Sequence, residues 1–172
     1  MRTNYTEAQK QFVIKATHVI DAFSKLPYKD KLELSVKEIE EIFREIKNIP
    51  AESDDVKMIK KLALDEVRKF RDKTSKNHVQ RIVQIKIEKE IIKKDVQQLK
   101  IDLEKIENNI FWKWLDMVDE KSREVRIKYQ KAQIRFKRLN DEYYYLKNSD
   151  PIASDKDIIM CKMNIQKLLL DV

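Results

Sequence analysis

The sequence predicts an all-α protein, and three observations support this fold class. Glycine is absent from the 172 residues, whereas ordinary usage near 7% would supply about a dozen. Without glycine, turns that need a positive φ become scarce, so an architecture built on β-hairpins is disfavoured. Charged residues make up 39% of the chain and hydrophobic residues 42%. The two classes are interspersed at helical spacing, which is typical of long exposed helices with apolar seams.

Residues 1–73 predict a small unit of three helices. The first helix begins at Thr6, and Thr6 with Gln9 has the spacing of a capping box. A second capping box is expected at Ser35 and Glu38, and Ser53 or Asp54 can cap the third helix. The prolines at positions 27 and 50 end the first two helices. The apolar stripes of the three helices are Phe12, Val13, Ala16, Val19, Ile20 and Phe23; Val36, Ile39, Ile42, Phe43 and Ile46; and Val56, Ile59, Ala63, Val67 and Phe70.

Residues 78–148 predict a long coiled-coil-like region, after a break or kink at Thr74–Asn77. Its heptad phase slips near Asn108-Asn109, which leaves two arrangements open: a continuous helix with a stutter, or a helical hairpin that turns at the two asparagines. The first apolar seam is Ile82, Ile85, Lys89, Ile92, Val96, Leu99, Leu103, Ile106 and Ile110, and the second is Leu115, Val118, Ser122, Val125, Tyr129, Ala132, Phe136, Leu139, Tyr143 and Leu146.

Residues 154–172 predict a short C-terminal helix that is capped by Ser154. Asp155 and Asp157 lie in its first turn, where carboxylates interact favourably with the helix dipole. Apolar residues recur at heptad spacing, so we expect this helix to fold back or to dock on a neighbour. The residues expected at a partner interface are Ile158, Ile165 and Leu168.

The stretch from Lys121 to Arg138 concentrates positive charge. It contains eight Lys or Arg and one acid, so its net charge of +7 equals that of the whole protein. Lys121, Lys128 and Arg135 occupy heptad position g, and Arg126 occupies e. A parallel homodimer would place cations opposite each other, which is repulsive. We therefore expect an acidic counterpart for the eight cations, which are Lys121, Arg123, Arg126, Lys128, Lys131, Arg135, Lys137 and Arg138.

Three counterparts are compatible with this stretch. Residues 102–120 carry six acids and two lysines, and an antiparallel neighbour could align them with the cations. The others are a nucleic acid and an anionic membrane surface. Aromatic residues interleave with the cations, and Tyr144 and Tyr145 follow them, either to stack on bases or to pack under the final helix. The sequence therefore favours nucleic acid, and single strands in particular.

The aromatic segment 110–115 contains both tryptophans, Trp112 and Trp114. Its apolar residues cover more than one helix face, so one seam cannot bury all of them. They mark either a packed junction or a hot spot for a partner protein, because tryptophan anchors carry much of the binding energy at interfaces.

Catalytic and metal-binding patterns are absent from the sequence. The histidines, His18 and His78, lie in separate elements and belong to no metal-binding motif, and a glycine-free chain has no glycine-rich phosphate loop. We expect no enzyme, no metal site and no cofactor. A lone cysteine, Cys161, and the lack of an apolar leader or an 18-residue apolar run predict a cytoplasmic protein, or a nuclear one in a eukaryotic host.

Several short motifs follow one another between residues 108 and 166: Lys113-Trp114-Leu115, Val125-Arg126-Ile127, Gln130-Lys131, Arg138-Leu139, Tyr143-Tyr144 and Ser154-Asp155-Lys156-Asp157-Ile158-Ile159. This succession resembles the UvsY-like family of phage recombination mediators. The resemblance implies a small, helical, self-associating, non-catalytic protein that binds single-stranded DNA and helps to load a recombinase. It also implies that the basic helix contacts DNA and that the C-terminal helix serves assembly.

The alternative is a coiled-coil adaptor or structural scaffold. In that case the basic helix pairs with an acidic surface, which is either residues 102–120, the acidic block, or a surface of another protein. This alternative gives the acidic block a role, whereas nucleic-acid binding gives it none.

Overall fold

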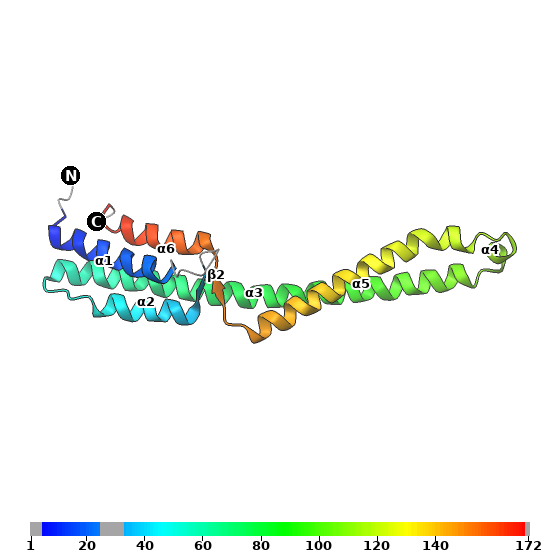
Figure 1. The fold of residues 1–172 in the computed structure, drawn as a ribbon, viewed down its shortest axis with the longest axis horizontal. Helices are drawn as coiled ribbons and strands as arrows, with labels where there is room; N and C mark the ends of the chain where they lie inside the picture. The colour runs from blue at the N-terminus through cyan, green and yellow to red at the C-terminus, as the bar shows by residue number, and fades with distance from the viewer. Residues whose placement is uncertain (1–4, 25–32, 171–172) are drawn as a thin grey trace. The chain divides into compact units, whose positions relative to one another are not determined.

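The all-α prediction is confirmed. The computed structural model describes residues 5–24 and 33–170. In order, these contain α1 (Glu7–Ser24), β1 (Leu34–Ser35), α2 (Val36–Asn48), α3 (Asp54–Glu107), α4 (Ile110–Trp114), α5 (Val118–Asn148), β2 (Ile152–Ala153) and α6 (Asp155–Lys167), which Figure 1 shows. The chain divides into two compact units. We call residues 1–79 with 150–172 the bundle unit, and residues 80–149 the hairpin unit.

The bundle unit packs α1, α2, α6 and the first part of α3 around one core. Its strands pair antiparallel, with Leu34 opposite Ala153 and Ser35 opposite Ile152, so the segment that leads into α6 is held beside the segment that leads into α2. The predicted stripes of the first three helices supply most of the core. Its buried residues are Phe12, Val13, Ala16, Ile20, Leu34, Ile39, Ile42, Ile46, Val56, Ile59, Ala63, Val67, Phe70, Ala153, Ile158, Cys161 and Ile165.

Helix α6 corrects the predicted partner interface. Ile158 and Ile165 are buried in the core of the bundle unit, and Leu168 packs against that core. The apolar stripe of α6 therefore faces its own chain, because the β1–β2 pairing returns the chain to the bundle before α6 begins. Burial also raises the pKa of Cys161 on the same stripe to about 12.

The helix starts follow the capping pattern of the sequence. The Ser35 hydroxyl accepts a hydrogen bond from the Glu38 amide, and the Glu38 carboxylate accepts one from the Ser35 amide. Thr6 and Gln9 form the same reciprocal pair. Single side-chain caps are formed by Ser53 to the Val56 amide and by Ser154 to the Asp157 amide.

The predicted break at Thr74–Asn77 is wrong, because α3 runs without interruption from Asp54 to Glu107. Thr74 is buried, and its hydroxyl donates to the Phe70 carbonyl one turn earlier at 2.9 Å. This bond satisfies the polar side chain inside the helix. The patch contains no glycine or proline, so poor helix propensity alone did not end the helix.

The hairpin unit settles the choice at Asn108-Asn109. Helix α3 ends at Glu107, α4 forms a short turn of helix, and α5 returns antiparallel to the second part of α3, as Figure 1 shows. The Asn109 side chain accepts hydrogen bonds from the Phe111 and Trp112 amides and so begins α4. The two predicted seams face each other, with Ile85, Ile92 and Leu139 buried at the centre. Ile110 and Leu115, the seam members nearest the turn, are exposed instead.

Candidate nucleic-acid interface

The predicted DNA-contacting residues lie on α5 of the hairpin unit, and heptad positions describe their surroundings. We assign position a to Ile82 on α3 and to Ser122 on α5, so that a and d form the shared seam. Positions e and g then flank the seam, while b, c and f form the outer face of each helix. Within α3 and α5, residues at a, d, e or g therefore belong to the seam or its flanks, and residues at b, c or f belong to the outer faces.

The g flank pairs opposite charges across the hairpin. Arg81 at g on α3 forms an ion pair with Glu142 at g on α5. Glu88 at g on α3 forms one with Arg135 at g on α5, and 3.7 Å separate the Glu88 carboxylate oxygen from the Arg135 guanidinium nitrogen. The next g positions on α3 are Asp95 and Asp102, and in the reverse order the next g positions on α5 are Lys128 and Lys121. By heptad position, the g cations of α5, which would repel in a parallel dimer, therefore lie opposite acidic g residues of α3 in the same chain. Heptad positions on α3 were the signal that could have identified Glu88, Asp95 and Asp102, which the sequence reading missed.

Two of these g cations are held within or near their own helix. The Lys128 ammonium lies 2.6 Å from the Glu124 carboxylate, and this hydrogen bond lowers the pKa of Glu124. The Lys121 ammonium lies over the Trp112 ring at 5.0 Å from its centroid, a cation–π contact.

Arg126 realises the predicted pairing with the acidic block. Its guanidinium lies 3.1 Å from Glu107 and 3.4 Å from Asp119, both within residues 102–120. Among the described residues, it is the member of the basic stretch that forms ion pairs with acids of this block. Internal pairing with the acidic block is therefore present for Arg126, and Arg135 forms its ion pair on the g flank.

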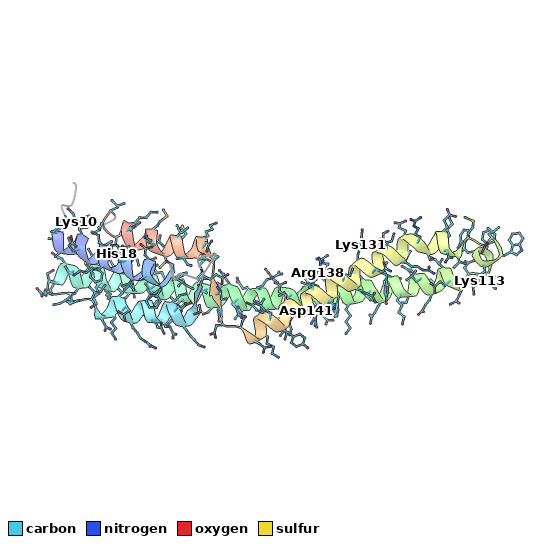
Figure 2. All side chains as sticks on the ribbon, in the orientation of Figure 1. Lys10, His18, Lys113, Lys131, Arg138 and Asp141 are labelled. Atoms are coloured by element: carbon cyan, nitrogen blue, oxygen red, sulfur yellow. The ribbon has the colours of Figure 1, made fainter. Side chains whose placement is uncertain are left out.

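The remaining four cations lie on the outer face of α5. Arg123 and Lys137 occupy position b, and Lys131 and Arg138 occupy position c. All four are exposed, and none forms an ion pair or hydrogen bond with another residue within 5–24 and 33–170. Figure 2 labels Lys131 and Arg138 on α5, with Asp141 one turn further along. The other members of this face are Glu124, Ile127, Gln130, Ile134, Asp141, Tyr144 and Tyr145.

The two predicted stacking tyrosines extend this face. Tyr144 lies seven residues after Lys137, and Tyr145 lies seven residues after Arg138, so each continues the line of its cation along α5. Their exposed fractions are 54% and 64%. Tyr143 instead lies in the seam, with its ring 4.8 Å from the Lys89 ammonium and 5.5 Å from the Tyr144 ring. The face therefore ends in two accessible aromatic rings, of which that of Tyr144 contacts the packed ring of Tyr143.

The two tryptophans that were predicted as anchors differ in their burial in the segment around α4. Trp112 is half-buried, contacts Phe111 edge-on at 5.1 Å and lies under Lys121. Trp114 is 79% exposed. The chain turns after α4 at Asp116, which has φ 54°. We name the exposed apolar residues of this segment the tip cluster: Ile110, Phe111, Trp114 and Leu115.

The excess positive charge belongs mainly to the hairpin unit. This unit has seventeen Lys and Arg against twelve Asp and Glu, a net charge of +5, while the bundle unit has twenty against eighteen, a net of +2. Within the described residues, no group of three or more His, Cys, Asp or Glu side chains is arranged to hold a metal ion. Among the same residues, no helix has the length and apolarity needed to cross a membrane.

Comparison with known proteins gives this chain no relative: no family model, no curated protein and no solved structure matches it.

Proposed function

We propose that this protein is a non-catalytic accessory that binds single-stranded nucleic acid, preferably DNA, through the outer face of α5. The observation that carries the proposal is the set of four exposed cations on that face that form no ion pair with any described residue: Arg123, Lys131, Lys137 and Arg138. The other four cations of the basic stretch each have a partner within the hairpin unit, whereas these four are directed outward.

The affinity in this proposal comes mainly from the phosphates. Lys and Arg that neutralise phosphates release condensed counterions, so binding is independent of sequence and weakens as salt rises. If the four outer cations engage about four phosphates, the slope of log K against log salt is about −3, taking about −0.7 per contact on single strands.

The preference for single strands comes from the tyrosines. Tyr144 and Tyr145 are more than half exposed at the end of the lines formed by the cations. A base in a duplex is stacked on both faces, whereas a base in a single strand offers a free face to an aromatic ring. A site that binds single strands without sequence preference combines two parts: cations that follow the phosphate backbone and aromatic rings on which the bases stack.

The resemblance to phage recombination mediators gives this binding a biological setting. It supports a role in which the protein occupies single strands during recombination or replication and assists the loading of another protein. Such a role places the protein in the cytoplasm, or in the nucleus of a eukaryotic host.

The test is a fluorescence anisotropy titration with single- and double-stranded oligonucleotides across a range of salt. Lys131→Gln with Lys137→Gln removes two outer cations and should reduce the slope by about 1.4. Lys100→Gln with Lys105→Gln removes the same charge from α3 and is the matched control, with a smaller expected change. Absence of binding at low salt overturns the proposal. Binding to anionic lipid vesicles but not to oligonucleotides would reassign the face to a membrane.

A second candidate function is that of a coiled-coil adaptor, and the tip cluster favours it. Trp114 and Ile110 are 79% and 84% exposed at the turn of the hairpin, and exposed tryptophans are frequent anchors in protein interfaces. Trp114→Ser separates the two functions. It should leave oligonucleotide affinity unchanged if α5 is the binding face, and it should abolish capture of a protein partner if the tip is the anchor.

A further inference from the structure

The outer face of α3 in the hairpin unit carries an apolar stripe that the hairpin does not use. Val83, Ile87, Ile91 and Ile101 occupy positions b, f, c and f, away from the seam. Their side chains are 45–57% exposed. Single exposed apolar residues are common on protein surfaces, but here Val83, Ile87 and Ile91 recur at successive turns of one face, and Ile101 follows on the same face.

The charges on this face differ from those on α5. Its charged members between positions 80 and 105 are two acids, Glu90 and Glu104, and two bases, Lys94 and Lys105, and the rest of its polar members are glutamines. The outer face of α3 is therefore neutral, whereas the outer face of α5 between positions 121 and 145 has four cations and two acids, a net charge of +2. Two copies that met through α5 would repel each other, and a polyanion has no electrostatic reason to choose α3.

The pattern on α3 is also complementary to itself when reversed. Around a centre at residue 92, position 83 corresponds to position 101, and position 90 corresponds to position 94. An antiparallel second copy therefore places Val83 against an isoleucine, and Glu90 against a lysine, twice over. A parallel copy would place Glu90 against Glu90 and Lys94 against Lys94, which is unfavourable.

We propose that two copies of this chain pair antiparallel through the outer face of α3, with a two-fold axis near residue 92. Val83 of each copy packs against Ile101 of the other, and Glu90 pairs with Lys94 of the other. Ile87 is covered by Gln97 and Ile91 by the aliphatic stem of Lys93, because positions 87 and 91 correspond to positions 97 and 93. Such an interface is isologous, since the same patch serves both copies. Each copy keeps its α5 face free for another ligand.

Sedimentation equilibrium across a concentration series tests the surface. Wild-type protein should show a monomer–dimer equilibrium. Ile87→Gln with Ile91→Gln should weaken the dimer by about tenfold or more, because apolar contacts are lost without added charge. The matched control is Ile127→Gln with Ile134→Gln, two comparably exposed isoleucines on the outer face of α5. A wild-type monomer at all concentrations overturns the proposal, as does a control variant that weakens the dimer equally.

Charge reversal tests the pairing. Glu90→Lys alone gives lysine against lysine, and Lys94→Glu alone gives glutamate against glutamate, so each should weaken self-association. A mixture of the two variants restores opposite charges at both contacts and should dimerise more tightly than either variant alone. Circular dichroism checks that helix content is unchanged. Equal association of the mixture and of the single variants contradicts the proposed contact.

The orientation is tested by oxidative crosslinking. Val83→Cys mixed with Ile101→Cys should give a disulfide-linked heterodimer, since the antiparallel pair brings these positions together. Neither variant should crosslink to itself, and the native Cys161 is buried. Crosslinking of Val83→Cys to its own copies would show a parallel pair and would overturn the antiparallel arrangement.

Discussion

Arg81 donates two hydrogen bonds to Glu142, from Nε to Oε1 at 2.8 Å and from Nη2 to Oε2 at 2.9 Å. The two residues are 61 positions apart in the chain, and both occupy position g of their helices. A fork of this kind matches the planar guanidinium to the planar carboxylate and so fixes direction as well as distance. It aligns α3 with α5 in the one antiparallel register that also brings Glu88 to Arg135.

A double-mutant cycle on this pair should give a coupling free energy of about 1 kcal/mol. Arg81→Gln and Glu142→Gln each remove one partner, and their combination removes both. Both side chains are about 40% exposed, so the coupling should fall as salt is added. Both tryptophans lie in the hairpin unit, so urea unfolding followed by tryptophan fluorescence reports on this unit. A coupling indistinguishable from zero at low salt would contradict a role for the pair in alignment.

Lys89→Ala should lower the free energy of unfolding of the hairpin unit by about 1–2 kcal/mol. Lys89 is the charged member of the α3 seam. Its ammonium donates to the Asn140 side chain and lies 5.6 Å and 4.8 Å from the ring centroids of Phe136 and Tyr143. The substitution removes these contacts together. Lys93→Ala, one turn away at the exposed flank, is the control, and an equal loss there would show that the seam contacts of Lys89 do not account for the effect.

Trp112 and Trp114 should respond differently to the same substitution. Trp112→Ser removes the ring that contacts Phe111 and Lys121, so we expect a loss of about 1 kcal/mol or more. Trp114→Ser removes an exposed ring, and surface changes usually stay within about 0.5 kcal/mol. Urea unfolding followed by circular dichroism measures both variants. Acrylamide should quench Trp114 more strongly, and the reverse order would place Trp114 in a packed environment.

Asp157 should make the bundle unit sensitive to acid. Hydrogen bonds from Lys73 and Ser154, of which that from Lys73 is the stronger influence, lower the pKa of Asp157 below its ordinary 3.8. A carboxylate whose pKa is lowered by folding stabilises the folded state above its unfolded pKa, and this stabilisation is lost as pH falls through the folded value. Asp157→Asn should therefore lower the free energy of unfolding at pH 7 by about 1 kcal/mol.

The difference between wild type and Asp157→Asn should shrink below the ordinary pKa of 3.8, because the wild-type carboxyl then becomes protonated as well. Thermal unfolding at a series of pH values measures this convergence. A difference that stayed constant into strong acid would mean that packing, and not the charge of Asp157, accounts for the effect. Asp155→Asn, on the exposed first turn of the same helix, is the matched control.

Much of the local structure was determined by the sequence alone. The capping residues Thr6, Ser35, Ser53 and Ser154 begin helices by bonding amides within three positions, so the interaction depends on no distant contact. The two heptad seams were equally readable, because a side chain's face on a helix follows from its spacing. The absence of glycine predicted the fold class for a similarly local reason, since it restricts turns wherever they occur.

The tertiary structure decided where the chain reverses direction and which surface each helix packs against. In the sequence, Asn108 and Asn109 were compatible either with a stutter in a continuous helix or with a turn. The structure has the turn, and contacts between residues far apart in the chain, such as Arg81 with Glu142, hold the two helices of the hairpin together. Helix α6 was expected either to fold back or to dock on a neighbour, and the pairing of β1 with β2 accompanies its return to the bundle core. The heptad of the sequence already separates the e and g cations from Arg123, Lys131, Lys137 and Arg138. Only the antiparallel packing against α3 decides that positions e and g flank a seam within the chain. Periodicity specifies a face on one helix, and which surface that face meets depends on residues far away in the chain.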